Sequence, residues 1–239
     1  MTSTIFLTTE WQNLAMINYE IDPTVLNPFI PAGTELDLWH GKALVSLVGL
    51  MFLNTRVQGF AIPFNKNFEE VNLRFYVKRT LPSGEVRRGV AFIKEIVPRR
   101  GIAFIARLIY NENYVAFPMQ HLFEQEDMNI RVEYRWKIDG QWNKFRTDCQ
   151  GFPKLPSSNS EAEFITEHYW GYSVQKNGET LEYQVEHSPW RIWEAVHFEV
   201  AINATACYGE NFTPFLEKAP VSVFLAEGSD VTVYKGTKL

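Results

Sequence analysis

The chain has 239 residues, of which 46% are hydrophobic and 21% are charged, a balance typical of a folded protein rather than a disordered one. Its formal charge of −5 comes from acids and bases that are well mixed, so the basic patch of a nucleic-acid-binding protein is missing and we expect no nucleic-acid partner. Single β barrels and sandwiches commonly have about 200–250 residues. No linker or internal repeat divides the chain, and we therefore expect one domain over residues 1–239.

Cysteine usage and hydropathy indicate the compartment. Cys149 and Cys207 lack the spacing of a zinc site or a disulfide framework, which fits a reducing cytoplasm. Residues 1–11 lack the basic start and apolar stretch of a signal peptide, and the longest apolar run, 43–53, is too short to span a bilayer. We expect a cytoplasmic protein with no membrane partner.

The first part of the chain predicts one helical turn followed by a buried strand. Asp22 suits the cap and Pro23 the first position of a short helix that continues through Leu26. The run 43–48 is nearly all apolar, which fits a strand buried on both faces or a buried helix. We favour the strand because glycines bracket the run.

The clearest pattern of the chain lies in residues 70–78. Apolar side chains at 71, 73, 75 and 77 alternate with polar ones, and a strand places the two sets on opposite faces. The polar set, called the polar row below, is Glu70, Asn72, Arg74 and Tyr76. Turn residues at 82–84 and a returning strand over 89–93 predict a hairpin.

The middle of the chain predicts a helix and a second hairpin. After a break at 98–101, the Ala, Leu and Arg content of residues 102–110 favours a helix. Strict alternation over 130–138, the turn Asp139-Gly140 and a strand over 142–146 together predict a hairpin at the surface.

The last third begins with a loop over 153–160. Ser160 suits the cap of a following helix, Glu163 occupies the capping-box position, and His168 is expected near the end of that helix. Further strands are expected at 181–187, 196–205, 221–226 and 231–234.

The polar row has two interpretations. On an outer face it is a solvated sheet surface. Inside a barrel, Glu70 and Arg74 need partners because burying an unpaired charge is costly, and such groups usually serve a ligand or a fixed polar network. Arg74 would suit a carboxylate or phosphate, since its planar fork can bind two oxygens at once.

The other chemical signals exclude more than they establish. None of the five histidines has metal-ligand spacing, so we predict no metal and no cofactor. His187 is the most informative of them, because it titrates near neutral pH and lies close to Trp190 and Arg191 at an expected strand end. The absence of GxSxG, a phosphate-binding glycine loop and a Rossmann fingerprint argues against the commonest hydrolases, kinases and dehydrogenases.

Five segments, in this order and spacing, resemble the uncharacterised YqjF-like family, domain of unknown function 2071; they are 31–37, 70–77, 88–92, 164–169 and 185–190. The resemblance spans almost the whole chain. That family is grouped by fold with acetoacetate decarboxylase. The resemblance therefore implies an α+β, mainly β fold, with an antiparallel β barrel or curved sheet, flanking helices and an internal cavity.

The resemblance also implies that a catalytic group is missing. In acetoacetate decarboxylases a lysine after a proline forms a Schiff base with a ketoacid, because burial and a neighbouring ammonium lower its pKa. In the matching segment, Met119 and Gln120 follow Pro118 where the two lysines would stand, whereas Glu70 matches a glutamate of the decarboxylase pocket. Schiff-base decarboxylation is therefore not expected.

A similar lysine context recurs at 151–154, where Lys154 follows a proline. This segment is part of the polar loop and lies far beyond Glu70 in the chain. We interpret Lys154 as an exposed lysine.

We expect a barrel pocket for a small carboxylate or carbonyl ligand, with Arg74 holding the ligand and Glu70 as candidate acid or base. The expected ligand-binding residues are Glu70, Asn72, Arg74, Tyr76, Arg107, Tyr114 and His187. Arg107 and Tyr114 are included because their helix and loop replace the lysine segment in the resemblance. Two alternatives stay open: a non-catalytic interaction protein whose polar row is a stabilising network, and a lyase or hydrolase of unknown substrate. The sequence does not predict an oligomeric state.

Overall fold

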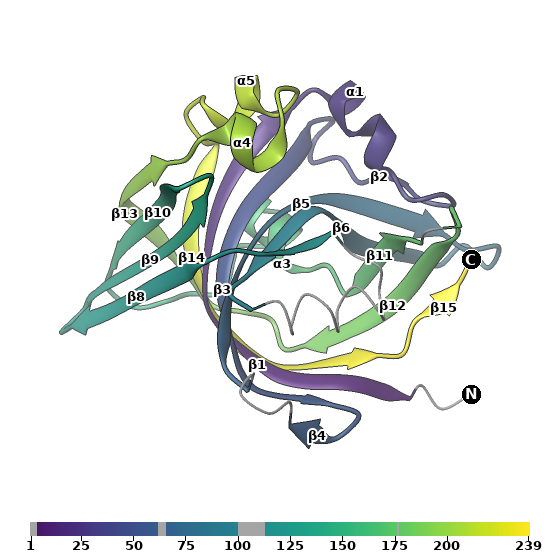
Figure 1. The fold of residues 1–239 in the computed structure, drawn as a ribbon. Coiled ribbons are helices and arrows are strands. Elements are labelled where there is room, and N and C mark those ends of the chain that lie inside the picture. Colours follow the sequence, from purple (N-terminus) through teal and green to yellow (C-terminus); the bar gives the residue numbers. More distant parts are fainter. Residues whose placement is uncertain (1–3, 62–65, 100–112, 176) are drawn as a thin grey trace.

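A strongly curved β sheet dominates the computed structural model, which describes residues 4–61, 66–99, 113–175 and 177–239 (Figure 1). The strands are β1 (Ile5–Ile21), β2 (Glu35–Leu36), β3 (Ala43–Val57), β4 (Phe60–Ala61), β5 (Phe68–Thr80), β6 (Val86–Val97), β7 (Tyr114–Ala116), β8 (Met119–Glu126), β9 (Asn129–Ile138), β10 (Gln141–Gln150), β11 (Trp170–Val174), β12 (Thr180–His187), β13 (Ile192–Ala201), β14 (Ser222–Tyr234) and β15 (Thr237–Lys238). The short helices are α1 (Pro23–Leu26), η1 (Asn27–Phe29), α3 (Glu161–Thr166), α4 (Ala204–Tyr208) and α5 (Thr213–Leu216). The helix expected over 102–110, and Arg107 with it, lies outside the described residues.

Strand pairing closes part of this sheet into a ring. Its strands follow one another in the order β12, β11, β6, β5, β3, β1 and β14, and β12 pairs in turn with β14. The pairs are antiparallel except for a short parallel contact between β11 and β6. The expectation of antiparallel pairing was wrong at that contact. The chain reaches β11 through a loop and α3 instead of a tight turn, so the strand direction is not forced to reverse.

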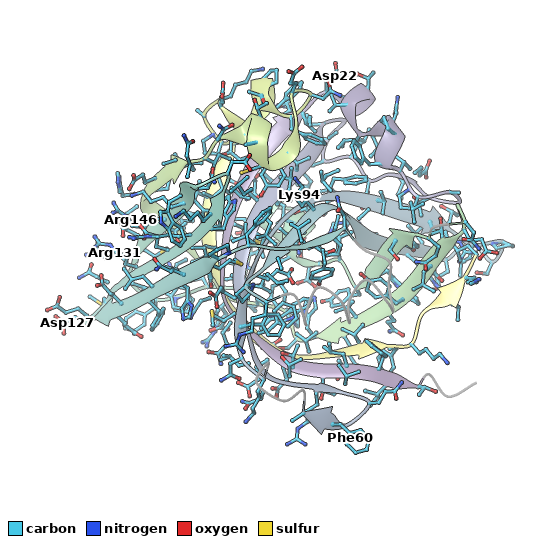
Figure 2. All side chains as sticks on the ribbon, viewed as in Figure 1. Asp22, Phe60, Lys94, Asp127, Arg131 and Arg146 are labelled. Atoms are coloured by element: carbon cyan, nitrogen blue, oxygen red, sulfur yellow. The ribbon has the colours of Figure 1, made fainter. Side chains whose placement is uncertain are left out.

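A second layer of strands extends from the ring through β13, β10, β9 and β8 (Figure 1). Asp127 lies at its tip, and Arg131 and Arg146 lie along it (Figure 2). The hairpin predicted over 130–146 is confirmed, with Asp139 and Gly140 both at positive φ in its turn. It is a surface hairpin on one face only, because Tyr134 and Trp136 are buried in the main core.

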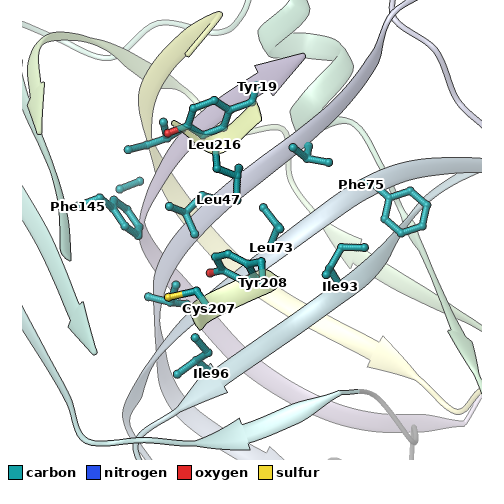
Figure 3. Packing of buried hydrophobic residues seen from close by; sticks show 14 of the residues in the cluster. Tyr19, Leu47, Leu73, Phe75, Ile93, Ile96, Phe145, Cys207, Tyr208 and Leu216 are labelled. Carbon is teal, nitrogen blue, oxygen red and sulfur yellow. The ribbon is translucent and has the colours of Figure 1, made fainter. Parts of the chain in front are cut away.

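Strand β5 confirms the strand predicted over 70–78, and both of its faces are buried. Its apolar face, which includes Leu73 and Phe75, packs in the main core (Figure 3). Tyr208 of α4 and Leu216 of α5 belong to the same core. Because the apolar face of β5 is buried in the main core, the opposite face, which carries the polar row, is the one that faces the inside of the ring.

The two predicted helix starts are confirmed. Asp22 accepts a hydrogen bond from the Thr24 amide (2.9 Å), and Ser160 accepts one from the Glu163 amide (3.2 Å). The Glu163 carboxylate accepts from the Asn159 amide at 2.6 Å, one residue earlier than in a standard capping box. His168 lies just beyond the end of α3, rather than inside it.

The predicted bounds of two strands were wrong. Strand β13 begins at Ile192 rather than at 196, and it ends at Ala201 rather than at 205 because the Asn203 side chain accepts from the Ala206 amide (3.0 Å) and starts α4. The strands expected at 221–226 and 231–234 are one strand, β14. Gly228 lets it continue, since its φ is +88° and a Cβ there would lie 1.9 Å from the Trp11 carbonyl oxygen.

No described helix is long and apolar enough to cross a membrane.

Candidate ligand-binding cavity

A cavity of about 140 Å³ lies inside the ring. Side chains from all seven ring strands and from α3 line it, and most of them are apolar. A cavity of about 150 Å³ is large enough to hold a benzene molecule. The space therefore suits a ligand of about six non-hydrogen atoms, provided that the polar part of the wall is matched.

The polar wall of the cavity is formed by Glu70, Asn72 and Arg74 of β5. Alternation along the strand places them on one face, and because the opposite face is buried in the core, this face points toward the inside of the ring. Tyr76 continues the row but does not line the cavity. Its hydroxyl is 2.5 Å from the Ser46 hydroxyl, which donates to Asn18 Oδ1 at 2.6 Å, so Tyr76 belongs to a separate hydrogen-bond chain.

Arg74 is a buried guanidinium without an ion-pair partner among the described residues. Its residue is 8% exposed, one Nη donates to the Ile165 carbonyl at the end of α3 (3.3 Å), and Nε has no partner in the described part of the chain. A buried cation is normally paired. The wall at Arg74 therefore favours an anion or a carbonyl oxygen.

Glu70 is 3% exposed and is bound by two neighbours. Asn72 Nδ2 donates to one carboxylate oxygen (2.9 Å) and the Tyr114 hydroxyl donates to the other (3.1 Å). Burial raises the pKa of Glu70 to about 7, although these hydrogen bonds and the charge of Arg74 oppose the shift. A carboxyl group with that pKa can hold or release a proton near neutral pH, as a general acid or base must.

A β-bulge brings a second acid to the cavity. On β6, Lys94 pairs with Leu73 but Phe92 pairs with Arg74, so one extra residue is inserted between them. As a result both Phe92 and Glu95 line the cavity, although regular alternation would place them on opposite faces. The sequence analysis missed Glu95, because a bulge inside an apolar strand carries no reliable sequence signal.

His168 was also missed as a cavity residue. It lines the cavity, and its Nε2 lies 3.3 Å from Asp37 Oδ2, which also accepts from Arg88 Nε at 2.6 Å. Burial lowers the pKa of His168 to about 4, and the nearby positive charges of Arg88 and Arg74 act in the same direction. Asp37 only partly offsets these effects, so His168 is neutral at pH 7. Its partner Asp37 is distant in the sequence, which is why spacing alone could not identify the pair.

His187 lines the cavity as part of an aromatic stack. Its ring lies between Tyr169 (4.7 Å) and Trp190 (4.1 Å), and its Nδ1 is 2.9 Å from the Ser188 carbonyl oxygen. Burial lowers its pKa. The stack fixes the ring as part of the wall.

The segment expected to replace the decarboxylase lysine lies only partly at the cavity. Tyr114 lines it, whereas Met119 and Gln120 lie in β8, paired with β9, and do not. The expectation that these two residues border the pocket was wrong, because the chain leaves the ring after Ala116 and joins the second layer. Lys154 is exposed, as interpreted from the sequence, and none of the described lysines lines the cavity.

Several buried polar atoms without a partner in the described chain belong to cavity-lining residues. Among them are Trp11 Nε1, Arg74 Nε, Asn72 Oδ1 and His168 Nδ1. Leaving such an atom unpaired costs about 1–3 kcal/mol, so their accumulation at one place indicates a binding site. The described residues contain no group of three or more His, Cys, Asp or Glu that could hold a metal ion.

Comparison with known sequences gives a family match and one curated relative. The model of domain of unknown function 2071, described as an uncharacterized conserved protein, matches residues 8–230. The uncharacterized protein YqjF of Bacillus subtilis is 23% identical over 195 residues, which are 81% of this chain and 77% of that protein.

Several solved structures with the same fold are structures of enzymes. The enduracididine biosynthesis enzyme MppR with bound HEPES buffer has a TM-score of 0.67 at 13% identity, covering 100% of this chain and 89% of its own. The same enzyme has also been solved in complex with pyruvate, with a TM-score of 0.65 at 13% identity, covering 100% and 91%. Acetoacetate decarboxylase from Legionella pneumophila has a TM-score of 0.65 at 13% identity, covering 99% and 88%. The acetoacetate decarboxylase-like, mainly β fold implied by the resemblance is thereby confirmed.

Proposed function

The chain belongs to the domain of unknown function 2071 family, and we propose that it binds a small carboxylate or carbonyl compound in the cavity of the ring. The observation that carries this proposal is Arg74, a buried guanidinium on the cavity wall with no ion-pair partner among the described residues and an unpartnered Nε. A carboxylate would supply the missing charge and the missing acceptor in one group. MppR, which has the same fold, binds pyruvate, a ligand of this class and size.

Glu70 is the acid or base of the proposed site. It lies two positions from Asn72 and four from Arg74 along one strand face, and its pKa of about 7 suits proton transfer near neutral pH. With no described lysine on the wall, the proposed chemistry does not pass through a Schiff base. Proton transfer to or from the bound ligand is the reaction type that Glu70 supports best, and the buried free thiols of Cys149 and Cys207 fit a cytoplasmic protein.

A direct test is calorimetric titration of the protein with small carboxylates and ketoacids at millimolar concentration, alongside the Arg74→Met variant. One charge-assisted contact contributes roughly 2–3 kcal/mol, so Arg74→Met should weaken binding by about 30- to 150-fold. Arg56→Met is the matched control, because Arg56 lies on ring strand β3 but is exposed and does not line the cavity. Its dissociation constants should match those of the wild type. Failure of every compound to bind, or equal binding to Arg74→Met, would contradict the proposal.

A further inference from the structure

The cavity carries unpartnered acceptors beside its unpartnered guanidinium. Asn72 Oδ1 and His168 Nδ1 are buried, belong to cavity-lining residues and have no hydrogen-bond partner in the described chain. A simple carboxylate has only acceptor oxygens, so it would satisfy Arg74 and leave both of these atoms unpaired. The polar wall of the cavity therefore favours a ligand that also has a hydrogen-bond donor.

The orientation of the Asn72 amide is fixed by its neighbour. Asn72 Nδ2 donates to Glu70 Oε1 at 2.9 Å. When Glu70 is ionised, its carboxylate can only accept hydrogen bonds, so reversing the amide would place Oδ1 against another acceptor. Beside ionised Glu70, Asn72 therefore presents an acceptor, and not a donor, as its free atom.

The tautomer of His168 is fixed in the same way. Asp37 accepts from Arg88 and contacts His168 Nε2, so this carboxylate is ionised and requires the proton of the imidazole to be on Nε2. Neutral His168 then has a lone pair on Nδ1. Its side chain is 1% exposed, and packing against Tyr76 (4.7 Å between ring centroids) holds the ring in place.

We propose that the cavity selects small carboxylates that carry a hydroxyl group, with Arg74 binding the carboxylate and His168 Nδ1 accepting the single hydrogen bond that the hydroxyl group donates. This inference rests on the proposed function, since it assumes a carboxylate at Arg74. An analogue with hydrogen in place of the hydroxyl (the deoxy acid) leaves the acceptors on the wall unpaired. An analogue with a carbonyl group there (the keto acid) places an acceptor oxygen against them. Sites built to pair with a hydroxyl discriminate strongly against analogues that lack it.

The test compares ligands that differ only at this group: glycolate with acetate, lactate with propionate and pyruvate, and 3-hydroxybutyrate with butyrate and acetoacetate. In at least one set, the hydroxy acid should bind wild-type protein at least about 10-fold more tightly than its analogues, as one unpaired buried acceptor costs about 1–3 kcal/mol. His168→Phe keeps a ring beside Tyr76 and should reduce the preference for the hydroxyl to about threefold or less. His197→Phe, at an exposed position on β13, is the matched control and should keep the full preference.

A second measurement does not depend on the folding of a variant. The ¹⁵N signal of His168 Nδ1 in the wild-type protein at neutral pH should shift on addition of the hydroxy acid and stay in place with the deoxy acid. Equal affinity for all members of every set, or a preference for the keto or deoxy acid, would overturn this inference and leave carboxylate binding intact. Failure of every compound to bind would overturn the proposed function itself.

Discussion

Two groups of buried charged side chains lie on the same ring of strands and differ in how their polar atoms are paired. In the first, the Glu182 carboxylate binds Arg79 (3.0 Å) through one oxygen and Arg87 (2.6 Å) through the other, and the Tyr172 hydroxyl adds a third contact at 3.1 Å. In the second, Arg74 lies on the cavity wall without an ion-pair partner among the described residues. Both Glu182 and Arg74 are almost completely removed from solvent.

The difference teaches that buried charge alone does not identify a binding site. The Glu182 group has a countercharge and a hydrogen bond for each oxygen, so it needs nothing from outside the protein. The cavity group has a cation, a carboxyl group with a raised pKa and several unpartnered atoms around an open space. The Glu182 group forms a stabilising network of the kind that was one interpretation of the polar row.

The largest expected effect comes from breaking the paired group. Glu182→Gln removes the charge that two arginines share, and we expect it to lower the free energy of unfolding by about 3 kcal/mol, as for other buried pairs that lose one partner. Urea denaturation measures this change. Glu186→Gln on the same strand is the control, because Glu186 is exposed and should change stability by less than about 0.5 kcal/mol. A Glu182→Gln loss as small as that of the control would mean that the paired group is not structural.

The pH dependence of stability should separate the two groups next. Above its ordinary pKa of 4.5, Glu70 is ionised in the unfolded chain but keeps its proton in the folded chain up to pH of about 7. The folded protein therefore loses stability as the pH rises through this window, and Glu70→Gln removes the loss. The variant should gain roughly 2 kcal/mol relative to wild type between pH 5 and pH 8.

The difference between Glu70→Gln and wild type is the informative quantity, because His168 acts in the opposite direction. Its pKa is lowered from 6.5 to about 4, so the unfolded chain takes up a proton first and the protein loses stability as the pH falls from 6.5 toward 4. Subtracting the two denaturation profiles cancels the His168 contribution. A difference that does not change with pH would show that Glu70 has an ordinary pKa.

A smaller effect on stability is expected for Arg74→Met. No described carboxylate loses its partner when Arg74 is replaced, so the free energy of unfolding should stay within about 1 kcal/mol of wild type or increase. Arg79→Met, on the same strand, should lower it by about 2 kcal/mol because Glu182 loses a partner. Thermal denaturation of both variants without ligand measures this difference in stability. Equal losses would place Arg74 in a structural network.

No effect is expected at Lys154. This side chain is exposed and lies outside the cavity lining, so borohydride treatment in the presence of acetoacetate should leave it unmodified. Mass spectrometry of the treated protein provides the measurement, with Lys154→Ala as the control. A covalent adduct on Lys154 would bring back Schiff-base chemistry.

Local features of the fold followed from the sequence. Alternation over 70–78 predicted β5, Asp139-Gly140 predicted the β9–β10 turn, and Asp22 and Ser160 predicted the starts of two helices. Each of these depends on residues that are neighbours in the chain, so the sequence contains the whole signal. The boundary of β13 was missed because the cap at Asn203 was overlooked inside an apolar stretch.

The candidate site was predictable only in part. The sequence by itself determined that Glu70, Asn72 and Arg74 share one strand face, because side chains alternate along any strand. Tertiary structure alone decided that this face turns into the ring, that Tyr76 binds Ser46 away from the cavity, and that a bulge adds Glu95. It also joined Asp37 to His168, 131 residues apart. Alternation shows which residues share a face of the strand, but it does not show which face points inward. Partners as distant in the sequence as Asp37 and His168 meet only when the closed ring brings their strands and loops together.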